Sequence, residues 1–145
     1  MYLVDTNILL RSLQTTHKDH GLATHALSTL LSQEQYLAIV PQIAAEFWNV
    51  CTRPQRVNGL GLSRDEAENR LAAYERAFTL HRDVPEIYDL WRRLVVQYDV
   101  SGKQVHDTRL AAAMMVHGLS HILTFNTDDF KRYKTLTVVH PQTVA

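Results

Sequence analysis

The chain has 145 residues, of which 46% are hydrophobic and 21% charged, as is usual for a soluble globular domain and unlike a disordered protein. Fifteen Lys and Arg residues balance fifteen Asp and Glu residues, so no overall positive field indicates nucleic-acid binding. Cys51 is the only cysteine, which excludes an internal disulfide framework and a multi-cysteine zinc site.

The length predicts one domain over residues 1–145 with a single packed core. The chain begins with the apolar run Met1–Val4 and reaches Asp5 without a basic residue, so no secretory signal is expected. No apolar run approaches the roughly 20 residues that cross a bilayer. We therefore expect a soluble, cytoplasmic protein.

In chain order, short apolar runs typical of buried strands alternate with segments of helical period. A strand over 2–4 is followed by a helix over 20–31 and a strand over 36–40. Pro41 suits the first turn of the next helix, which is expected to continue to about Arg53. A glycine-containing loop over 54–62 comes after that helix.

The next helix is predicted to begin at Ser63, because a serine is a good N-cap and Glu66 completes a capping box. It is expected to end near Phe78, before a short strand over 79–81. A further helix covers 85–98. Residues 63–98 thus hold two helices with little strand between them, and we predict a helical arm that projects from the sheet.

The last third of the chain contains one predicted helix and two predicted strands. The helix covers 106–117, and Gly118 suits its C-terminal cap. The strands cover 121–123 and 136–139. Because strands alternate with helices, the fold class is α/β, with a mostly parallel sheet that is covered by helices on both faces.

Acidic residues lie where these strands end or helices begin. Asp5 directly follows the first strand, Glu46 lies one turn into the helix after the second, and Asp107 starts a later helix. The polar residues after the strand 121–123 are Asn126, Asp128 and Asp129. Ligands bind at the carboxyl ends of parallel strands, so these side chains are expected to converge.

Most of these residues also have a structural explanation. Asp5 and Thr6 are common helix N-caps. The helix dipole favours Asp107 at a helix start whatever its function. Asp128 and Asp129 suit a solvated turn. Their combination is therefore more informative than any one of them.

Glu46 is harder to explain by local structure, because it lies beside the face of its helix that should be buried. An ion pair with Arg109 is the structural alternative. Two carboxylates about 4 Å apart repel by roughly 4 kcal/mol at an effective dielectric constant of 20, so a cluster needs a proton or a cation. Oxygen ligands without cysteine favour Mg²⁺ or Mn²⁺ over zinc. His106, beside Asp107, is more often a supporting or capping residue than a metal ligand.

Four motifs contain these residues: VDTNILL at 4–10, AEFWNV at 45–50, HDTRLAA at 106–112, and LTFN at 123–126 with Asp129 and Phe130. In this order they resemble the PIN-domain ribonucleases, and within them the VapC-type toxins of bacterial toxin–antitoxin pairs. The resemblance covers essentially the whole chain. It implies a three-layer α/β/α sandwich.

The resemblance also implies a catalytic site. Asp5, Glu46 and Asp107 match the acidic residues of the family that bind metal. Asn126 falls where many members have a fourth Asp and others have Asn, so Asp128 or Asp129 is an alternative for completing the site. The residues that match small hydroxyl positions near the site, expected to hold a water or a phosphate oxygen, are Thr6 and Thr124.

The implied activity is Mg²⁺- or Mn²⁺-dependent endoribonuclease cleavage that leaves a 3′-hydroxyl and a 5′-phosphate. The basic residues expected near the strand ends, which either contact RNA or are solvated surface charges, are Arg11, Lys103, Arg109, Lys131 and Arg132. The implied partners are RNA, a small antitoxin that covers the site, and a second copy in a homodimer or a larger toxin–antitoxin assembly.

Two alternatives remain open: a catalytically weak PIN-like module that binds proteins, and a housekeeping RNA-processing nuclease. A phosphatase with an aspartyl nucleophile is disfavoured, because the sequence Asp5-Thr6-Asn7 lacks the second Asp that would act as its general acid.

Overall fold

Five short parallel strands form the middle layer of the computed structural model, which describes all residues from 1 to 145. In the sheet they are ordered β3-β2-β1-β4-β5. Their bounds are β1 Tyr2–Val4, β2 Leu37–Ile39, β3 Thr79–Leu80, β4 His121–Leu123 and β5 Thr137–Val139. Because all strands run in the same direction, their carboxyl ends lie at one edge of the sheet.

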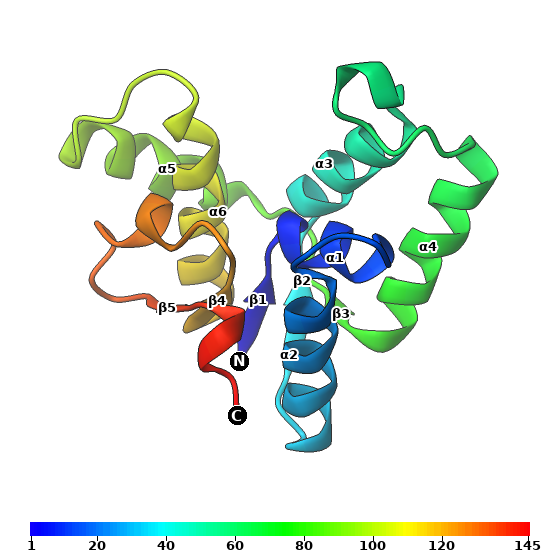
Figure 1. The fold of residues 1–145 in the computed structure, drawn as a ribbon. Coiled ribbons are helices and arrows are strands. Elements are labelled where there is room, and N and C mark those ends of the chain that lie inside the picture. Colours follow the sequence, from blue (N-terminus) through cyan, green and yellow to red (C-terminus); the bar gives the residue numbers. More distant parts are fainter.

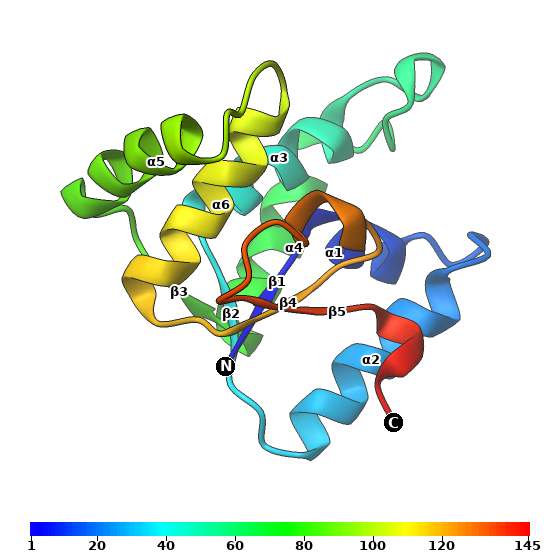
Figure 2. The same cartoon turned by 90° about the vertical axis from the view of Figure 1, so that its left-hand side faces the viewer.

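Helices cover both faces of this sheet, which confirms the predicted α/β/α sandwich (Figures 1 and 2). One layer contains α1 Thr6–Leu13, α2 His20–Ser32, α3 Pro41–Thr52 and α4 Arg64–Ala77. The other contains α5 Pro85–Gln97 and α6 Gln104–His117, which pack closely on each other. Three short 3₁₀ helices complete the chain: η1 Gln55–Val57, η2 Thr127–Phe130 and η3 Pro141–Thr143.

Local signals determine most helix ends. The Ser63 hydroxyl accepts a hydrogen bond of 3.1 Å from the backbone N–H of Glu66, as the capping box predicts. Gly118 ends α6 in the left-handed conformation with φ of 69°, which costs glycine nothing. The helix α6 begins at Gln104, two residues before the predicted start, so Asp107 lies inside its first turn.

Residues 63–98 do not form the projecting arm that helical propensity predicts. The short strand β3 divides the segment and pairs with β2 at the edge of the sheet. As a result α4 packs on α3 on one face, while α5 packs on α6 on the other. Strand pairing, which helical periodicity does not report, sends the two helices to different layers.

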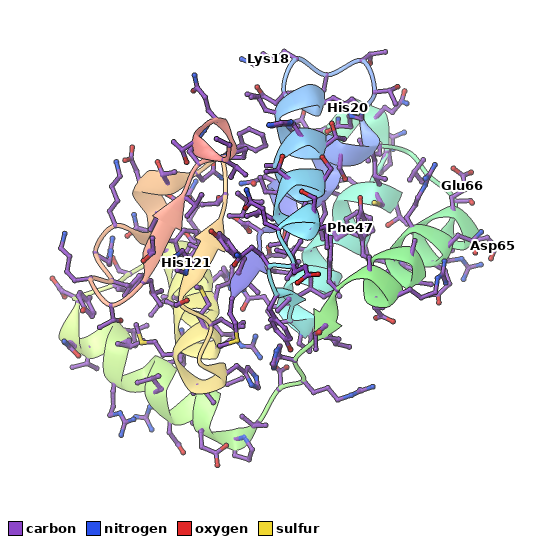
Figure 3. The ribbon with its side chains drawn as sticks, turned by 90° about the horizontal axis from the view of Figure 1, so that it is seen from below. Lys18, His20, Phe47, Asp65, Glu66 and His121 are labelled. Atoms are coloured by element: carbon purple, nitrogen blue, oxygen red, sulfur yellow. The ribbon has the colours of Figure 1, made fainter.

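The core lies between the sheet and the two helix layers. Phe47 of α3 is fully buried and lies among the interior side chains, whereas Lys18, Asp65 and Glu66 lie at the periphery (Figure 3). In α6 the consecutive residues Ala111–Ala113 are all buried, so neighbouring elements cover this helix on more than one side. None of the helices combines the length and apolar character needed to cross a membrane.

The strand order changes direction at β1. The chain leaves β1 toward β2 on one side, and the later strand β4 pairs with β1 on the other side. In an α/β sheet such a switch point opens a crevice above the carboxyl ends of the two central strands. Asp5 directly follows β1, and Thr124 directly follows β4.

Candidate functional site

Asp5 directly follows β1 at this switch point, where such a crevice is expected, and is only 7% exposed. It is the N-cap of α1, and its Oδ1 accepts a hydrogen bond of 2.7 Å from the backbone N–H of Thr6. The hydroxyl of Thr124 donates a second hydrogen bond of 2.7 Å to Oδ2. The ends of two adjacent strands therefore hold this carboxylate in one orientation.

The hydroxyl of Thr124 takes part in three hydrogen bonds. Besides donating to Asp5, it accepts from the backbone N–H of Asn126 at 3.0 Å and from Nδ2 of Asn7 at 3.2 Å. Asn7 also accepts a hydrogen bond of 3.2 Å from the backbone N–H of Phe125. These bonds join the start of α1 to the loop after β4.

Glu46 projects from α3 toward the same edge, and both of its carboxylate oxygens are held. The hydroxyl of Thr6 donates to Oε2 at 2.9 Å, and Nε2 of Gln42 donates to Oε1 at 3.1 Å. The alternative ion pair between Glu46 and Arg109 does not form. Arg109 instead pairs with Asp83 at 3.1 Å and donates to Oε1 of Gln42 at 3.0 Å.

Asp107 faces the site from the first turn of α6. It is half-buried, and its carboxylate accepts no hydrogen bond from the protein. Burial, followed by the negative charges of Asp129, Asp5 and Glu46, raises the pKa of Asp107 to about 6. The structure therefore brings these carboxylates within electrostatic reach of one another.

The pKa of Asp5 is also raised to about 6. Burial is the main cause, and the charges of Glu46 and Asp129 contribute. The hydrogen bonds from Thr124 and Thr6 act in the opposite direction, because they stabilise the ionised form. Two acids that resist ionisation in one crevice are typical of a functional site.

Asp128 and Asp129 are neighbours on the loop after β4, but only one of them acts on the site. Asp128 points to solvent, with a side chain that is 88% exposed, and its hydrogen bond to Lys131 lowers its pKa. Asp129 is the one whose charge acts on Asp5 and Asp107. Asn126 is exposed at the N-cap of η2, and its side chain forms no hydrogen bond.

None of the predicted basic residues forms an ion pair with the carboxylates of the site. Arg11 donates to Gln14 at 2.6 Å, Arg132 donates to Gln104 at 2.7 Å, and Lys103 is exposed at the start of α6. The ion pairs of the structure involve none of the four carboxylates that face the crevice, which are those of Asp5, Glu46, Asp107 and Asp129.

The donor set of this crevice fits a hard divalent cation. No three His, Cys, Asp or Glu side chains lie close enough together to bind one metal ion by themselves. Mg²⁺ does not require such a cage, because it keeps several waters and binds through one or two carboxylates. The crevice offers oxygen ligands, uncompensated negative charge and two carboxylates with raised pKa values.

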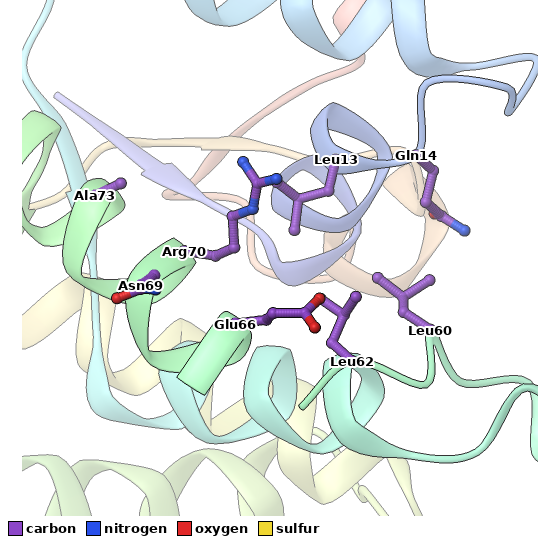
Figure 4. Close-up of a pocket in the computed structure, with 8 residues that line it drawn as sticks. All are labelled: Leu13, Gln14, Leu60, Leu62, Glu66, Asn69, Arg70 and Ala73. Atoms are coloured by element: carbon purple, nitrogen blue, oxygen red, sulfur yellow. The ribbon is translucent and has the colours of Figure 1, made fainter. Parts of the chain in front are cut away.

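Two cavities lie outside the carboxylate cluster. One, of about 430 Å³, lies between the end of α1 and the start of α4 and contains none of the predicted site residues (Figure 4). The other, of about 560 Å³, lies along α5 and α6 and reaches the site only through His106 and Arg109. Neither cavity contains Asp5, Glu46 or Asp107.

Sequence reasoning missed three residues of the hydrogen-bond network: Asn7, Gln42 and Asp83. The contact of Gln42 with Glu46 could have been predicted, because Gln42 precedes Glu46 by four residues and therefore lies on the same face of the helix. Asn7 stands in the first motif, two residues after Asp5, but its bond to the loop after β4 depends on the tertiary fold. No sequence signal indicates that Asp83 pairs with Arg109.

The raised pKa of Asp5 predicts how stability depends on pH. Because its pKa is 3.8 ordinarily and about 6 in the folded protein, Asp5 favours folding below pH 3.8 and loses this contribution as pH rises through 6. With a chelator present, Asp5→Asn should therefore gain stability relative to the parent between pH 4 and pH 7.5, by at most about 3 kcal/mol. Urea unfolding at both pH values measures this difference.

The matched control is Asp89→Asn, which changes an exposed carboxylate on α5. Its free energy of unfolding should stay parallel to that of the parent over the same range. Parallel curves for Asp5→Asn would show that Asp5 ionises as easily in the folded chain as in the unfolded chain.

Comparison with known proteins gives a family and a fold. A model of the PIN domain matches residues 2–136. No curated protein matches the chain. Its fold resembles that of VapBC2 from Rickettsia felis bound to a promoter DNA fragment, with 16% identity, a TM-score of 0.70, and coverage of 96% of this chain and 97% of that chain. It also resembles VapBC-1 from nontypeable Haemophilus influenzae, with 13% identity, a TM-score of 0.71, and coverage of 98% of both chains. A third similar structure is VapC20 from Mycobacterium tuberculosis, a sarcin-ricin loop cleaving toxin, with 15% identity, a TM-score of 0.65, and coverage of 92% of this chain and 95% of that chain.

Proposed function

The chain belongs to the PIN domain family, and from this membership and its carboxylate crevice we propose that it is a Mg²⁺- or Mn²⁺-dependent endoribonuclease, the toxin of a toxin–antitoxin pair. The observation that carries the proposal is the group of carboxylates without a cationic partner at the switch point of the sheet. The VapBC complexes and the sarcin-ricin loop cleaving toxin among the similar folds support a toxin role and an RNA substrate.

Asp5 and Asp107 are proposed to hold the metal ion, with Glu46 bound to it through a water, since no three of these side chains lie close enough to bind one ion together. Such an ion lowers the pKa of a bound water and neutralises negative charge on the scissile phosphate. Thr124 and Thr6 orient the carboxylates of Asp5 and Glu46 through their hydroxyl groups.

The proton of the attacking water goes to a carboxylate of the chain in this proposal. Glu46 suits this role because both of its oxygens have fixed hydrogen-bond donors, and Asp107 suits it because its carboxylate is free of protein hydrogen bonds. Asn126 and Asp129 lie on the loop after β4, and the charge of Asp129 would favour binding of the cation.

The partners are proposed on the same basis. RNA would reach the crevice past Arg11 and Arg109, and Lys103, Lys131 and Arg132 lie on the neighbouring segments. A small antitoxin would cover the carboxylates with a basic side chain, and the toxin would form a homodimer. A catalytically weak protein-binding module is the second candidate function, favoured by the exposed amide of Asn126 at the position where many members have a fourth Asp.

The proposal is tested with the purified chain and single-stranded RNA. We expect cleavage with Mn²⁺ or Mg²⁺, none with EDTA, fragments that carry 5′-phosphates, and specific Mn²⁺ binding by calorimetry. A DNA oligonucleotide of the same sequence is the control and should remain intact. Mn²⁺ binding that is absent at pH 7.5 would favour the protein-binding module, and cleavage that survives EDTA would exclude the metal-dependent reaction.

A further inference from the structure

Gln42 connects three groups around the crevice. Its Nε2 donates to Oε1 of Glu46 at 3.1 Å and to the backbone carbonyl of His106 at 2.9 Å. Its Oε1 accepts a hydrogen bond of 3.0 Å from Nη1 of Arg109. One amide side chain therefore contacts the carboxylate on α3 and the residue that precedes Asp107 on α6.

The chemistry of these three partners leaves the amide of Gln42 only one orientation. A guanidinium only donates hydrogen bonds, whereas a carboxylate and a backbone carbonyl only accept them. The oxygen of Gln42 must therefore face Arg109, and its nitrogen must face Glu46 and His106. A Glu at this position would lack the two donated bonds.

This bridge spans the two helix layers. The helix α3 packs with α1 and α4 on one face of the sheet, and α6 packs with α5 on the other. The two helices meet above the carboxyl edge, where Gln42 bonds to the backbone of α6. The side chain thereby links the helix that carries Glu46 to the helix that carries Asp107.

Arg109 contacts the amide oxygen of Gln42, whereas Glu46 and His106 contact its nitrogen. It donates to Gln42 with one nitrogen and pairs with Asp83, on the loop before α5, with the other. The planar guanidinium can serve both partners at once, which a lysine ammonium at this position cannot do in the same geometry. Asp83 thus contacts Arg109, Arg109 contacts Gln42, and Gln42 contacts Glu46.

We propose that Gln42 is a positioning residue, which orients Glu46 relative to Asp107, and that Arg109 acts on the site by holding Gln42. This inference rests on the proposed metal-dependent nuclease activity. Groups that orient the ligands of a metal typically change its affinity or the activity by 10–100-fold when they are lost.

The test compares Gln42→Met with the parent. Methionine matches the length of glutamine and favours the helix, but it has none of the three hydrogen bonds. We expect Mn²⁺ affinity, measured by calorimetry without RNA, to fall about tenfold, and kcat to fall about 10–100-fold at an unchanged KM for RNA. The melting temperature in EDTA should fall by a few degrees at most, because the three hydrogen bonds that are lost are only partly buried or exposed. Gln33→Met is the control, because it also removes a hydrogen bond but lies far from the crevice, on the carbonyl of Ala145.

Arg109→Lys is the second variant, because it keeps the positive charge and loses the planar fork. It should weaken Mn²⁺ binding in the same direction, and it should have no further effect when Gln42 is already Met. Unchanged Mn²⁺ affinity and kcat in Gln42→Met would overturn the positioning role while the parent still binds Mn²⁺ and cleaves RNA. Failure of the parent itself to bind Mn²⁺ would instead contradict the proposed function.

Discussion

Replacing Asp107 by Asn is expected to lower RNA cleavage at least about 100-fold while the fold remains intact. The reason is that the negative charge of Asp107 would be lost from the proposed metal site, where charge stabilisation amounts to several kcal/mol and each 1.36 kcal/mol corresponds to tenfold in rate. Single-turnover cleavage of a labelled RNA in Mn²⁺ measures the effect. A rate within threefold of the parent would exclude Asp107 from the reaction.

Stability separates this interpretation from a structural role. The carboxylate of Asp107 accepts no hydrogen bond from the protein and faces other negative charges, so an amide at this position removes repulsion and no favourable bond. In EDTA at pH 7.5 the melting temperature of Asp107→Asn should equal or exceed that of the parent. A decrease of several degrees would instead indicate that the charge of Asp107 stabilises the fold.

Replacing Thr124 by Val is expected to affect stability and activity together. Valine has nearly the same shape but lacks the hydroxyl that donates to Asp5 and accepts from the loop after β4. Because a hydrogen bond to a buried charged group contributes about 1.5–3 kcal/mol, we expect a loss of about 2 kcal/mol in the free energy of unfolding at pH 7.5. Cleavage should also fall, since Asp5 would lose its orientation.

The pH dependence of this loss follows from the charge on Asp5. The bond from Thr124 lowers the pKa of Asp5, so its removal raises the pKa further above 6. Near pH 4.5 Asp5 is protonated in the folded protein, and the deficit of Thr124→Val should then be smaller than at pH 7.5. The control is Thr124→Ser, which keeps the hydroxyl. A deficit equal at both pH values, or shared by Thr124→Ser, would assign the effect to packing.

Most of the fold was predictable because its signals are local, although the helix α1 at Thr6–Leu13 was not predicted. Short apolar runs mark the strands, and caps such as Ser63 and Gly118 mark the helix ends within about two residues. The two helices of 63–98 and the strand between them were predicted, but not that α4 and α5 join different layers, because this depends on the pairing of β3 with β2, a contact between distant segments. Helical period alone gives no information about which layer a helix joins.

The candidate site was predictable at the level of residue type and edge of the sheet. Asp5, Glu46 and Asp107 follow from strand ends and from the family resemblance, and their role as metal ligands stays a prediction. Their hydrogen-bond partners did not follow, because these depend on tertiary contacts. Arg109 illustrates the point: Asp83 takes the ion pair that sequence reasoning considered for Glu46.

The three buried alanines in the middle of α6 have a consequence for the first turn of that helix. Since no protein group donates a hydrogen bond to the carboxylate of Asp107, its location depends on the path of α6, whose residues Ala111–Ala113 are buried in the core. A larger side chain at one of these three positions would shift α6, and the shift would move the carboxylate of Asp107 away from Asp5. The location of the Asp107 carboxylate thus depends on three small core residues that have no functional group of their own.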